Sequence, residues 1–261
     1  MLDVVGLVPA AGIGARLGPL PCSKEIMPVG FADAPSRRPK AVSEYLLESF
    51  RIAGARRVFF VIRRGKWDIP EFFGDGQQLG LQIAYLMMRL PFGAAFTLDQ
   101  AYPFLGQANV LLGFPDVIFR PADAFRPLLE RMKRTSADVV LGLFPTATPG
   151  KMDMVEVDRR GRVKGIEIKP EATKLSRSWI IAAWSPRFTD YLHQYVETHG
   201  PRLNLEMPET HVGEVFQSAI EDRLVVDSVQ FPSGACLDTG TPEDMRHAIR
   251  LAGAGDVRAG L

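Results

Sequence analysis

Apolar, strand-like segments alternate with helical segments over the first 144 residues of this 261-residue chain. Strands that are joined through helices run parallel and bury both faces of their sheet. The alternation therefore predicts an α/β fold, in which a mostly parallel sheet is covered by helices on both faces. The predicted elements are strand 4–9, helix 41–53, strand 58–62, strand 81–87, helix 93–105, strand 110–112, helix 121–133 and strand 138–144.

The second part of the chain contains shorter and more mixed segments. A turn at 159–161 separates strand-like residues 154–157 from 163–168, and this pattern predicts a hairpin. No repeat and no low-complexity linker interrupts the chain, so we expect residues 1–261 to form a single domain. The remaining predicted elements are helix 186–198, helix 212–221, strand 224–231, helix 242–252 and a glycine-rich tail at 253–261.

The composition argues against several classes of protein. The longest apolar runs are far shorter than the roughly 20 residues that a membrane-spanning helix needs, and the first residues lack the pattern of a secretory signal. The two cysteines and four histidines show no zinc-site spacing. The net charge near +1 does not call for nucleic acid, and we interpret the basic clusters 37–40 and 63–66 as solvated faces. We therefore expect a cytoplasmic protein that binds neither membranes nor nucleic acid, and a homo-oligomer stays open.

A glycine-rich turn follows the first predicted strand at residues 11–14. Because Gly12 and Gly14 have no side chains and Ala11 has a small one, backbone N–H groups in this turn can approach phosphate oxygens. Arg16 and Lys24 follow and add positive charge. We interpret the segment as a phosphate-binding loop, although a tight connection between a strand and a helix has the same local sequence.

A dinucleotide-binding oxidoreductase also begins with a strand and a glycine-rich turn. Its fingerprint has a third glycine three residues after the second, where this chain has Leu17. The second strand ends in Arg63 and Arg64 instead of the acidic residue that holds a ribose. Since an arginine at this point can hold a 2′-phosphate, an NAD(P)-dependent oxidoreductase stays open as the weaker alternative.

Residues 7–30, LVPAAGIGARLGPLPCSKEIMPVG, resemble the signature loop of the sugar-phosphate nucleotidylyltransferases, in particular the bacterial glucose-1-phosphate uridylyltransferases and thymidylyltransferases. Ala15 stands where that family has a threonine, and the stretch between Arg16 and Lys24 is shorter than in the family. The residues that match the signature are Gly12, Gly14, Arg16, Leu17, Pro19, Lys24, Pro28 and Val29.

Further family landmarks follow in the expected order and extend the resemblance over nearly the whole chain. They are residues 74–85 before the base-reading loop, 91–95 in the loop that closes over the substrates, 112–119 at a metal-binding turn, 161–170 in a hairpin and 237–242 at a second metal-binding aspartate. The resemblance implies the Rossmann-like fold of the nucleotide-diphospho-sugar transferases. It also implies that residues 1–144 form the nucleotide-binding half and residues 145–252 the sugar-phosphate-binding half with the C-terminal helix.

The resemblance implies an enzyme that makes a nucleoside-diphosphate sugar and pyrophosphate from a nucleoside triphosphate, with UTP or dTTP favoured, and a sugar 1-phosphate. Arg16 and Lys24 are the expected catalytic residues. Because a hard divalent cation prefers oxygen ligands, we expect Mg²⁺ to be held by Asp116 and Asp238. The expected nucleotide-binding residues are Ala11, Gly12, Gly14, Met88 and Gly93, and the expected sugar-phosphate-binding residues are Asp153, Ile168 and Lys169.

Several recognition positions depart from the family pattern. Ile168 replaces a glutamate that holds sugar hydroxyls, and Met88 replaces a glutamine that binds the pyrimidine edge. Asp153 replaces a glycine, and Trp184 follows Ala183 where the family has an aliphatic residue and a tyrosine. An active transferase with another sugar or base is one explanation, in which apolar Met88, Ile168 and Trp184 suit a less hydroxylated acceptor. A non-catalytic, nucleotide-sugar-sensing regulator is the other, and the intact phosphate and metal positions favour the enzyme.

Overall fold

The structure is a computed structural model that describes residues 3–32, 37–89, 93–199, 210–253, 258 and 261. Its main element is a nine-stranded sheet with the order β10-β9-β11-β6-β1-β4-β5, in which β8 pairs with β11 and β12 pairs with β8. These strands are β1 (Val4–Pro9), β4 (Arg57–Arg63), β5 (Gln82–Met88), β6 (Asn109–Leu112), β8 (Val139–Pro145), β9 (Met154–Val157), β10 (Val163–Glu167), β11 (Arg177–Trp184) and β12 (Val226–Gln230).

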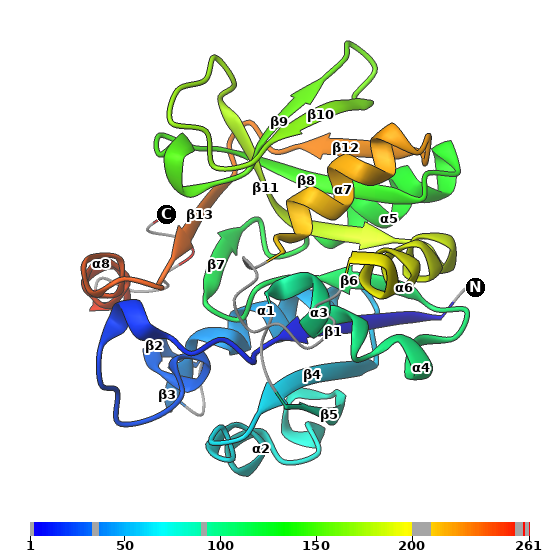
Figure 1. Ribbon diagram of the computed structural model, residues 1–261. Coiled ribbons are helices and arrows are strands. Elements are labelled where there is room, and N and C mark those ends of the chain that lie inside the picture. The colour runs from blue at the N-terminus through cyan, green and yellow to red at the C-terminus, as the bar shows by residue number, and fades with distance from the viewer. Residues whose placement is uncertain (1–2, 33–36, 90–92, 200–209, 254–257, 259–260) are drawn as a thin grey trace.

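The sheet combines a parallel block with an antiparallel strand. β1 lies between β4 and β6 and is parallel to both, and β5 continues the block beside β4. β11 runs antiparallel to β6 and β8, whereas β12 is parallel to β8. Strands from both predicted halves thus belong to one sheet (Figure 1).

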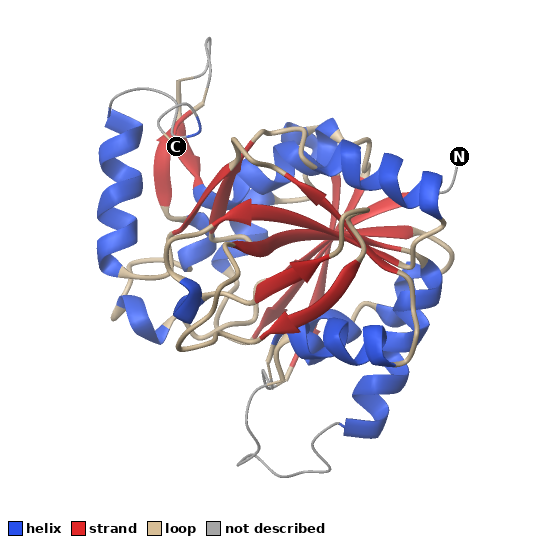
Figure 2. Cartoon of the chain, turned by 90° about the horizontal axis from the view of Figure 1, so that it is seen from above, coloured by secondary structure: helices blue, strands red, loops and turns tan. Residues whose placement is uncertain are grey.

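Helices cover both faces of this sheet, as predicted (Figure 2). α1 (Val42–Ile52) and α5 (Phe125–Thr135) pack on one face, and α3 (Ala94–Asp99), α6 (Pro186–His199) and α7 (Val212–Glu221) pack on the other. A Cβ atom at Gly6 of β1 would lie 2.5 Å from the ring of Phe50 in α1. Glycine at this position therefore allows the helix to approach the central strand closely.

The structure also differs from the predicted elements. The single helix expected at 93–105 is two short helices, α3 and α4 (Tyr102–Leu105), and Pro103 lies in the first turn of α4, where its missing N–H costs nothing. α2 (Asp68–Phe73) was not predicted. Neither were two antiparallel ribbons outside the main sheet, which are β2 (Pro28–Phe31) with β3 (Pro39–Ala41) and β7 (Val117–Arg120) with β13 (Ala235–Asp238).

The C-terminal helix α8 (Pro242–Gly253) packs beside β2 and β13, away from the main sheet (Figure 1). Its residues Met245 and Ala248 form a separate buried cluster with Val29, Ile118 and Leu237. Of the predicted tail, residues 254–257 and 259–260 lie outside the described residues. Within the described part of the chain, no helix is both long enough and apolar enough to cross a membrane.

Trp184 lies in the protein core, so the expectation that it contacts an acceptor is wrong. It is the last residue of β11 and is fully buried, and its indole N–H donates to Thr189 Oγ1 at 3.0 Å. Its ring packs edge-on against Phe188 with the centroids 5.5 Å apart. Pairing of β11 with strands on both sides directs this side chain into the space between the sheet and α6.

Replacing Trp184 with phenylalanine should destabilise the fold, because the variant loses the hydrogen bond to Thr189 and leaves a cavity. We expect the free energy of unfolding, measured by urea denaturation, to fall by about 1–3 kcal/mol. Trp67→Phe is the matched control, since Trp67 is 59% exposed, and its effect should stay within about 0.5 kcal/mol. Equal effects of the two substitutions would contradict the core position of Trp184.

Candidate active site

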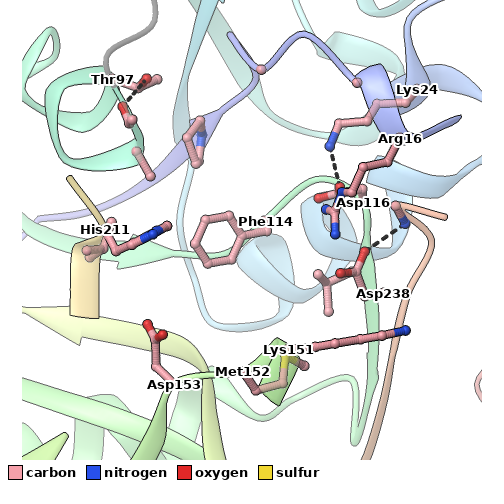
Figure 3. Close-up of a pocket in the computed structure, with 18 of the residues that line it drawn as sticks. Arg16, Lys24, Thr97, Phe114, Asp116, Lys151, Met152, Asp153, His211 and Asp238 are labelled. Carbon is pink, nitrogen blue, oxygen red and sulfur yellow. Dashed lines mark hydrogen bonds and ion pairs between the residues drawn. The ribbon is translucent and has the colours of Figure 1, made fainter. Parts of the chain in front are cut away.

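A cavity of about 710 Å³ opens at the carboxyl ends of β1 and β6 (Figure 3). The glycine-rich turn after β1 and the 3₁₀ turn Lys24–Ile26 form one wall. Residues 151–153, Lys169 and the start of α7 form the opposite wall. Ligand sites in sheets of this kind gather at the carboxyl ends of parallel strands, because several loops meet there.

Most of the predicted site residues line this one cavity, although they come from distant parts of the chain. They are Ala11, Gly12, Gly14, Arg16, Lys24, Gly93, Asp116, Asp153, Lys169 and Asp238. Of the predicted closing loop at 91–95, Pro91 and Phe92 lie outside the described residues. The fold thus gathers the loop, the two aspartates and the predicted phosphate-binding lysine in a single place.

The glycine-rich turn presents its backbone to the cavity. Gly14 has a φ of 73°, which glycine adopts without strain, and it precedes the 3₁₀ turn Ala15–Leu17. A Cβ atom at Gly12 would meet no atom within 4 Å, so the space beside this residue is open to a ligand. Backbone N–H groups exposed in this way can donate hydrogen bonds to phosphate oxygens.

Lys24 and Asp116 form an ion pair in the wall of the cavity that contains the glycine-rich turn. Lys24 Nζ lies 2.5 Å from Asp116 Oδ2, and both side chains are largely buried. Burial lowers the pKa of Lys24, but the charge of Asp116 and the hydrogen bond to it outweigh this effect and raise the pKa above its ordinary value. Lys24 is therefore a fixed positive charge at neutral pH.

A short ribbon brings Asp238 to the same place. Asp116 precedes β7 and Asp238 ends β13, and the two strands pair with Asp238 opposite Val117. The N–H and the hydroxyl of Thr239 each donate to the carbonyl oxygen of Asp116 at 2.9 Å. This ribbon, which the sequence pattern did not indicate, joins residues from the middle and the end of the chain.

The two carboxylates lie close enough to affect each other. The pKa of Asp238 is raised, mainly by burial and further by the negative charge of Asp116. The Gly240 N–H and the charges of Arg16 and Lys24 lower this pKa, but their effects are smaller. A Cβ atom at Gly240 would lie 2.8 Å from Asp238 Oδ1 and 3.0 Å from Arg16 Nη2. The arrangement surrounds two repelling carboxylates with cationic side chains, and it favours a further cation between them.

Lys169 lies on the opposite wall with an unusual backbone conformation. Its φ is 41°, in the left-handed region that residues other than glycine rarely adopt. Its Nζ is 3.5 Å from His211 Nδ1. Strained backbone of this kind persists where the surrounding structure fixes it, and it is common at ligand-binding positions.

Asp153 lies on the same wall beside an aromatic surface. Trp179 Nε1–H donates to Asp153 Oδ2 at 3.2 Å, and the rings of Trp179 and Phe114 are 5.7 Å apart. Oδ1 of Asp153 is buried and has no hydrogen-bond partner among the described residues. Burial raises the pKa of Asp153 more than the Trp179 N–H and the charges of His211 and Lys169 lower it. A hydrogen-bond donor on a ligand would remove the cost of this unsatisfied oxygen.

Among the described residues, Met88 and Ile168 do not belong to the cavity lining, so their predicted contacts with base and sugar need correction. Met88 is 4% exposed, and its Sδ accepts a hydrogen bond from Thr97 Oγ1 at 3.4 Å. Ile168 packs against the core, where its Cδ1 would lie 2.8 Å from a Cβ atom at Gly213 of α7. Met88 is the last residue of β5 and faces the core, whereas Ile168 follows the end of β10 and is half-buried against the core.

A buried ion pair that the sequence did not predict lies next to Lys24. Glu25 is 1% exposed and Lys66 is 5% exposed, and Glu25 Oε1 lies 2.5 Å from Lys66 Nζ. Glu25 lines the cavity, and its Oε2 has no partner among the described residues. The interpretation of cluster 63–66 as a solvated face is therefore wrong for Lys66. The start of α2 packs on the turn that carries Lys24, and local sequence does not show this contact.

Other lining residues were also missed by sequence reasoning. Phe114 lies within the predicted metal-binding turn at 112–119, and Lys151 and Met152 directly precede Asp153. Their closeness in sequence to predicted site residues was an available signal. Thr97, Trp179 and His211 carried no such signal, because only the packing of α3, β11 and α7 brings them to the cavity.

Removal of Lys66 should leave Glu25 as an uncompensated buried charge. We expect Lys66→Met to lower the free energy of unfolding by about 3–5 kcal/mol, and the double variant Glu25→Gln/Lys66→Met to recover a large part of the loss. Arg57→Ala, which breaks an exposed pair with Asp3, is the control and should cost less than about 1 kcal/mol. Denaturant titration of the wild type and these three variants measures the free energy of unfolding. If Lys66→Met loses no more of this free energy than Arg57→Ala, the buried ion pair is refuted.

The chain is similar to known nucleotidyltransferases over most of its length. A low-salt glycan biosynthesis nucleotidyltransferase of Haloferax volcanii is 25% identical over 250 residues, which are 94% of this chain and 65% of that protein. A glucose-1-phosphate thymidylyltransferase of an Actinoplanes species is 27% identical over 259 residues, which are 98% of this chain and 80% of that protein. The chain thus spans just under two thirds of the length of the Haloferax relative.

Solved structures confirm the predicted fold class. The crystal structure of a UDP-glucose pyrophosphorylase with UDP-glucose aligns with a TM-score of 0.79 at 16% identity, and covers 98% of this chain and 100% of that one. The family model described as nucleotidyl transferase matches residues 5–253. Since this match covers nearly the whole chain, the protein belongs to the nucleotidyl transferase family.

Proposed function

We propose that this protein transfers a nucleotidyl group from a nucleoside triphosphate to a sugar 1-phosphate and releases pyrophosphate. The observation that carries the proposal is the meeting of Arg16, Lys24, Asp116 and Asp238 with a glycine-rich turn in one cavity, across from Lys169. dTTP is favoured as the donor because relatives of this chain are named glucose-1-phosphate thymidylyltransferases. UTP is the other favoured donor, because residues 7–30 also resemble the signature loop of the uridylyltransferases.

The reaction needs no nucleophile from the protein. An oxygen of the sugar phosphate attacks the α-phosphorus and forms a new P–O bond, while the bond from that phosphorus to the oxygen bridging the α- and β-phosphates breaks. The bond electrons leave with pyrophosphate. Because the attacking oxygen is already anionic, catalysis consists of positioning and charge neutralisation.

The nucleotide side of the cavity neutralises the triphosphate. Backbone N–H groups of the turn with Gly12 and Gly14 hold phosphate oxygens. Arg16 stabilises the departing phosphates, and Lys24 stabilises charge on the α-phosphate in the transition state.

The donor set beside the turn fits a magnesium ion. Asp116 and Asp238 supply two carboxylates. A site with three or more His, Cys, Asp or Glu ligands is not found among the described residues, so the protein would supply only these two side chains to the ion. Mg²⁺ commonly uses one or two carboxylates and takes its other ligands from substrate phosphates and water. When bound, the ion supplies positive charge that offsets the repulsion between the two phosphate groups.

The acceptor side combines a cation, a carboxylate and aromatic rings. Lys169 binds the sugar phosphate, and Asp153 accepts a hydrogen bond from the sugar through its unsatisfied oxygen. Phe114 and Trp179 supply an apolar surface for a face of the sugar ring. A purely regulatory relative has no need of the four charged residues on the nucleotide side, and their joint presence therefore favours an enzyme.

A substrate panel tests this proposal. The protein is mixed with Mg²⁺, each common nucleoside triphosphate and a set of sugar 1-phosphates, and pyrophosphate release is measured. We expect release with at least one pair, dependent on both substrates. If the protein binds nucleotide sugars but releases no pyrophosphate with any substrate pair, the proposed activity is contradicted and a nucleotide-sugar-sensing role is favoured.

Asp116→Asn should reduce kcat by several orders of magnitude, because the variant removes negative charge that holds the metal ion. Circular dichroism and the midpoint of thermal unfolding serve as controls for folding. Asp123→Asn provides the matched control, since Asp123 is exposed and does not belong to the described lining of the cavity. Turnover of Asp116→Asn equal to that of the control would rule out a metal-binding role for Asp116.

A further inference from the structure

A lysine outside the predicted set lines the cavity from the acceptor side. Lys151, Met152 and Asp153 are consecutive and all three belong to the lining. They directly precede β9, and β10 pairs antiparallel with β9 so that Glu167 lies opposite Met154. The residues just before β9 and just after β10, Lys151 and Lys169 among them, therefore flank the open end of one hairpin.

The backbone around Lys151 is well defined. Residues Pro149–Lys151 form a 3₁₀ turn in which Lys151 N–H donates to Thr148 O at 3.1 Å and Met152 N–H donates to Pro149 O at 3.0 Å. A Cβ atom at Gly150 would lie 3.8 Å from Pro170 O, so this turn is in contact with the segment that carries Lys169. The hairpin thus holds two lysines at the mouth of the cavity.

The side chain of Lys151 extends toward the end of the cavity where Asp238 lies. Figure 3 shows it running away from Asp153 along the wall below Asp238. Lys151 is exposed, so its ammonium group stays hydrated until a ligand arrives. Its position differs from that of Lys169, which lies beside His211.

The charges of the loaded site favour a further cation. The triphosphate and the sugar phosphate together carry more negative charge than Arg16, Lys24 and Lys169 neutralise with one divalent ion, and the carboxylates of the metal pair add to the excess. A cation that lies where the two phosphates meet reduces the repulsion between them.

We propose that Lys151 is a further catalytic residue, which contacts phosphate oxygens where the acceptor phosphate meets the nucleotide. This inference rests on the proposed nucleotidyl transfer. Lys151 then supplies positive charge to the phosphates from the acceptor side, and Arg16 and Lys24 supply it from the nucleotide side. The positive charge of the Lys151 side chain matters more for activity than the shape of the side chain, because Lys151 acts as a cation near a flexible phosphate group.

The test compares four variants of the full chain with the wild type, using the substrate pair found with the panel. We expect Lys151→Ala and Lys151→Gln to lower kcat/KM for the sugar 1-phosphate roughly 10- to 100-fold, and Lys151→Arg to stay within about three-fold of the wild type. Lys164→Ala, at an exposed position of the same hairpin outside the described lining, should stay within about two-fold. Binding of the nucleotide alone, measured by calorimetry, should change less than about two-fold in every variant.

The outcomes separate the role of Lys151 from the proposed function. A wild type that turns over normally together with an unchanged Lys151→Ala would overturn the role of Lys151 alone. A loss of activity in Lys151→Arg as large as that in Lys151→Ala would also overturn it, because charge would then not be the cause. A wild type without turnover on any pair would overturn the proposed function and the role of Lys151 with it.

Discussion

The ion pair between Lys24 and Asp116 is the interaction that holds the site together. The two residues are 92 positions apart in the chain, and their charged atoms lie 2.5 Å apart at the carboxyl edge of the parallel block. Removing two charged groups from water is costly, so such a pair forms only where the geometry and further hydrogen bonds compensate. Here the glycine-rich turn, the pair of Glu25 with Lys66 and the β7–β13 ribbon fix both partners.

The mixed sheet explains why the cavity has two chemically different walls. The parallel strands β1 and β6 deliver the glycine-rich turn and Asp116 to one wall, whereas the antiparallel strand β11 and the β9–β10 hairpin deliver Asp153, Trp179 and Lys169 to the other. Cations therefore face each other across the cavity, with two carboxylates near one of the walls. This arrangement suits the meeting of two phosphate groups, which repel each other in water.

Much of the fold and of the site could be predicted because the signals are local. The alternation of strands and helices indicated the fold class, and the matched segments around Gly12, Lys24, Asp116 and Asp238 indicated the residues of the cavity. Burial was not predictable, because it depends on packing between segments far apart in the chain. Lys66 was expected in solvent and is buried beside Glu25. Met88, Ile168 and Trp184 were expected at the substrate, but Met88 and Trp184 lie in the core and Ile168 packs against it.

The most direct test of charge neutralisation at this site is a crystal structure with both substrates in place. It would contain Mg²⁺, a sugar 1-phosphate and a nucleoside triphosphate analogue with a methylene group between the α- and β-phosphates. We expect the α-phosphate beside Lys24, the metal ion on Asp116 and Asp238, and the acceptor phosphate at Lys169. A triphosphate bound outside this cavity, or an ion held by other residues, would contradict the proposed roles of these four residues.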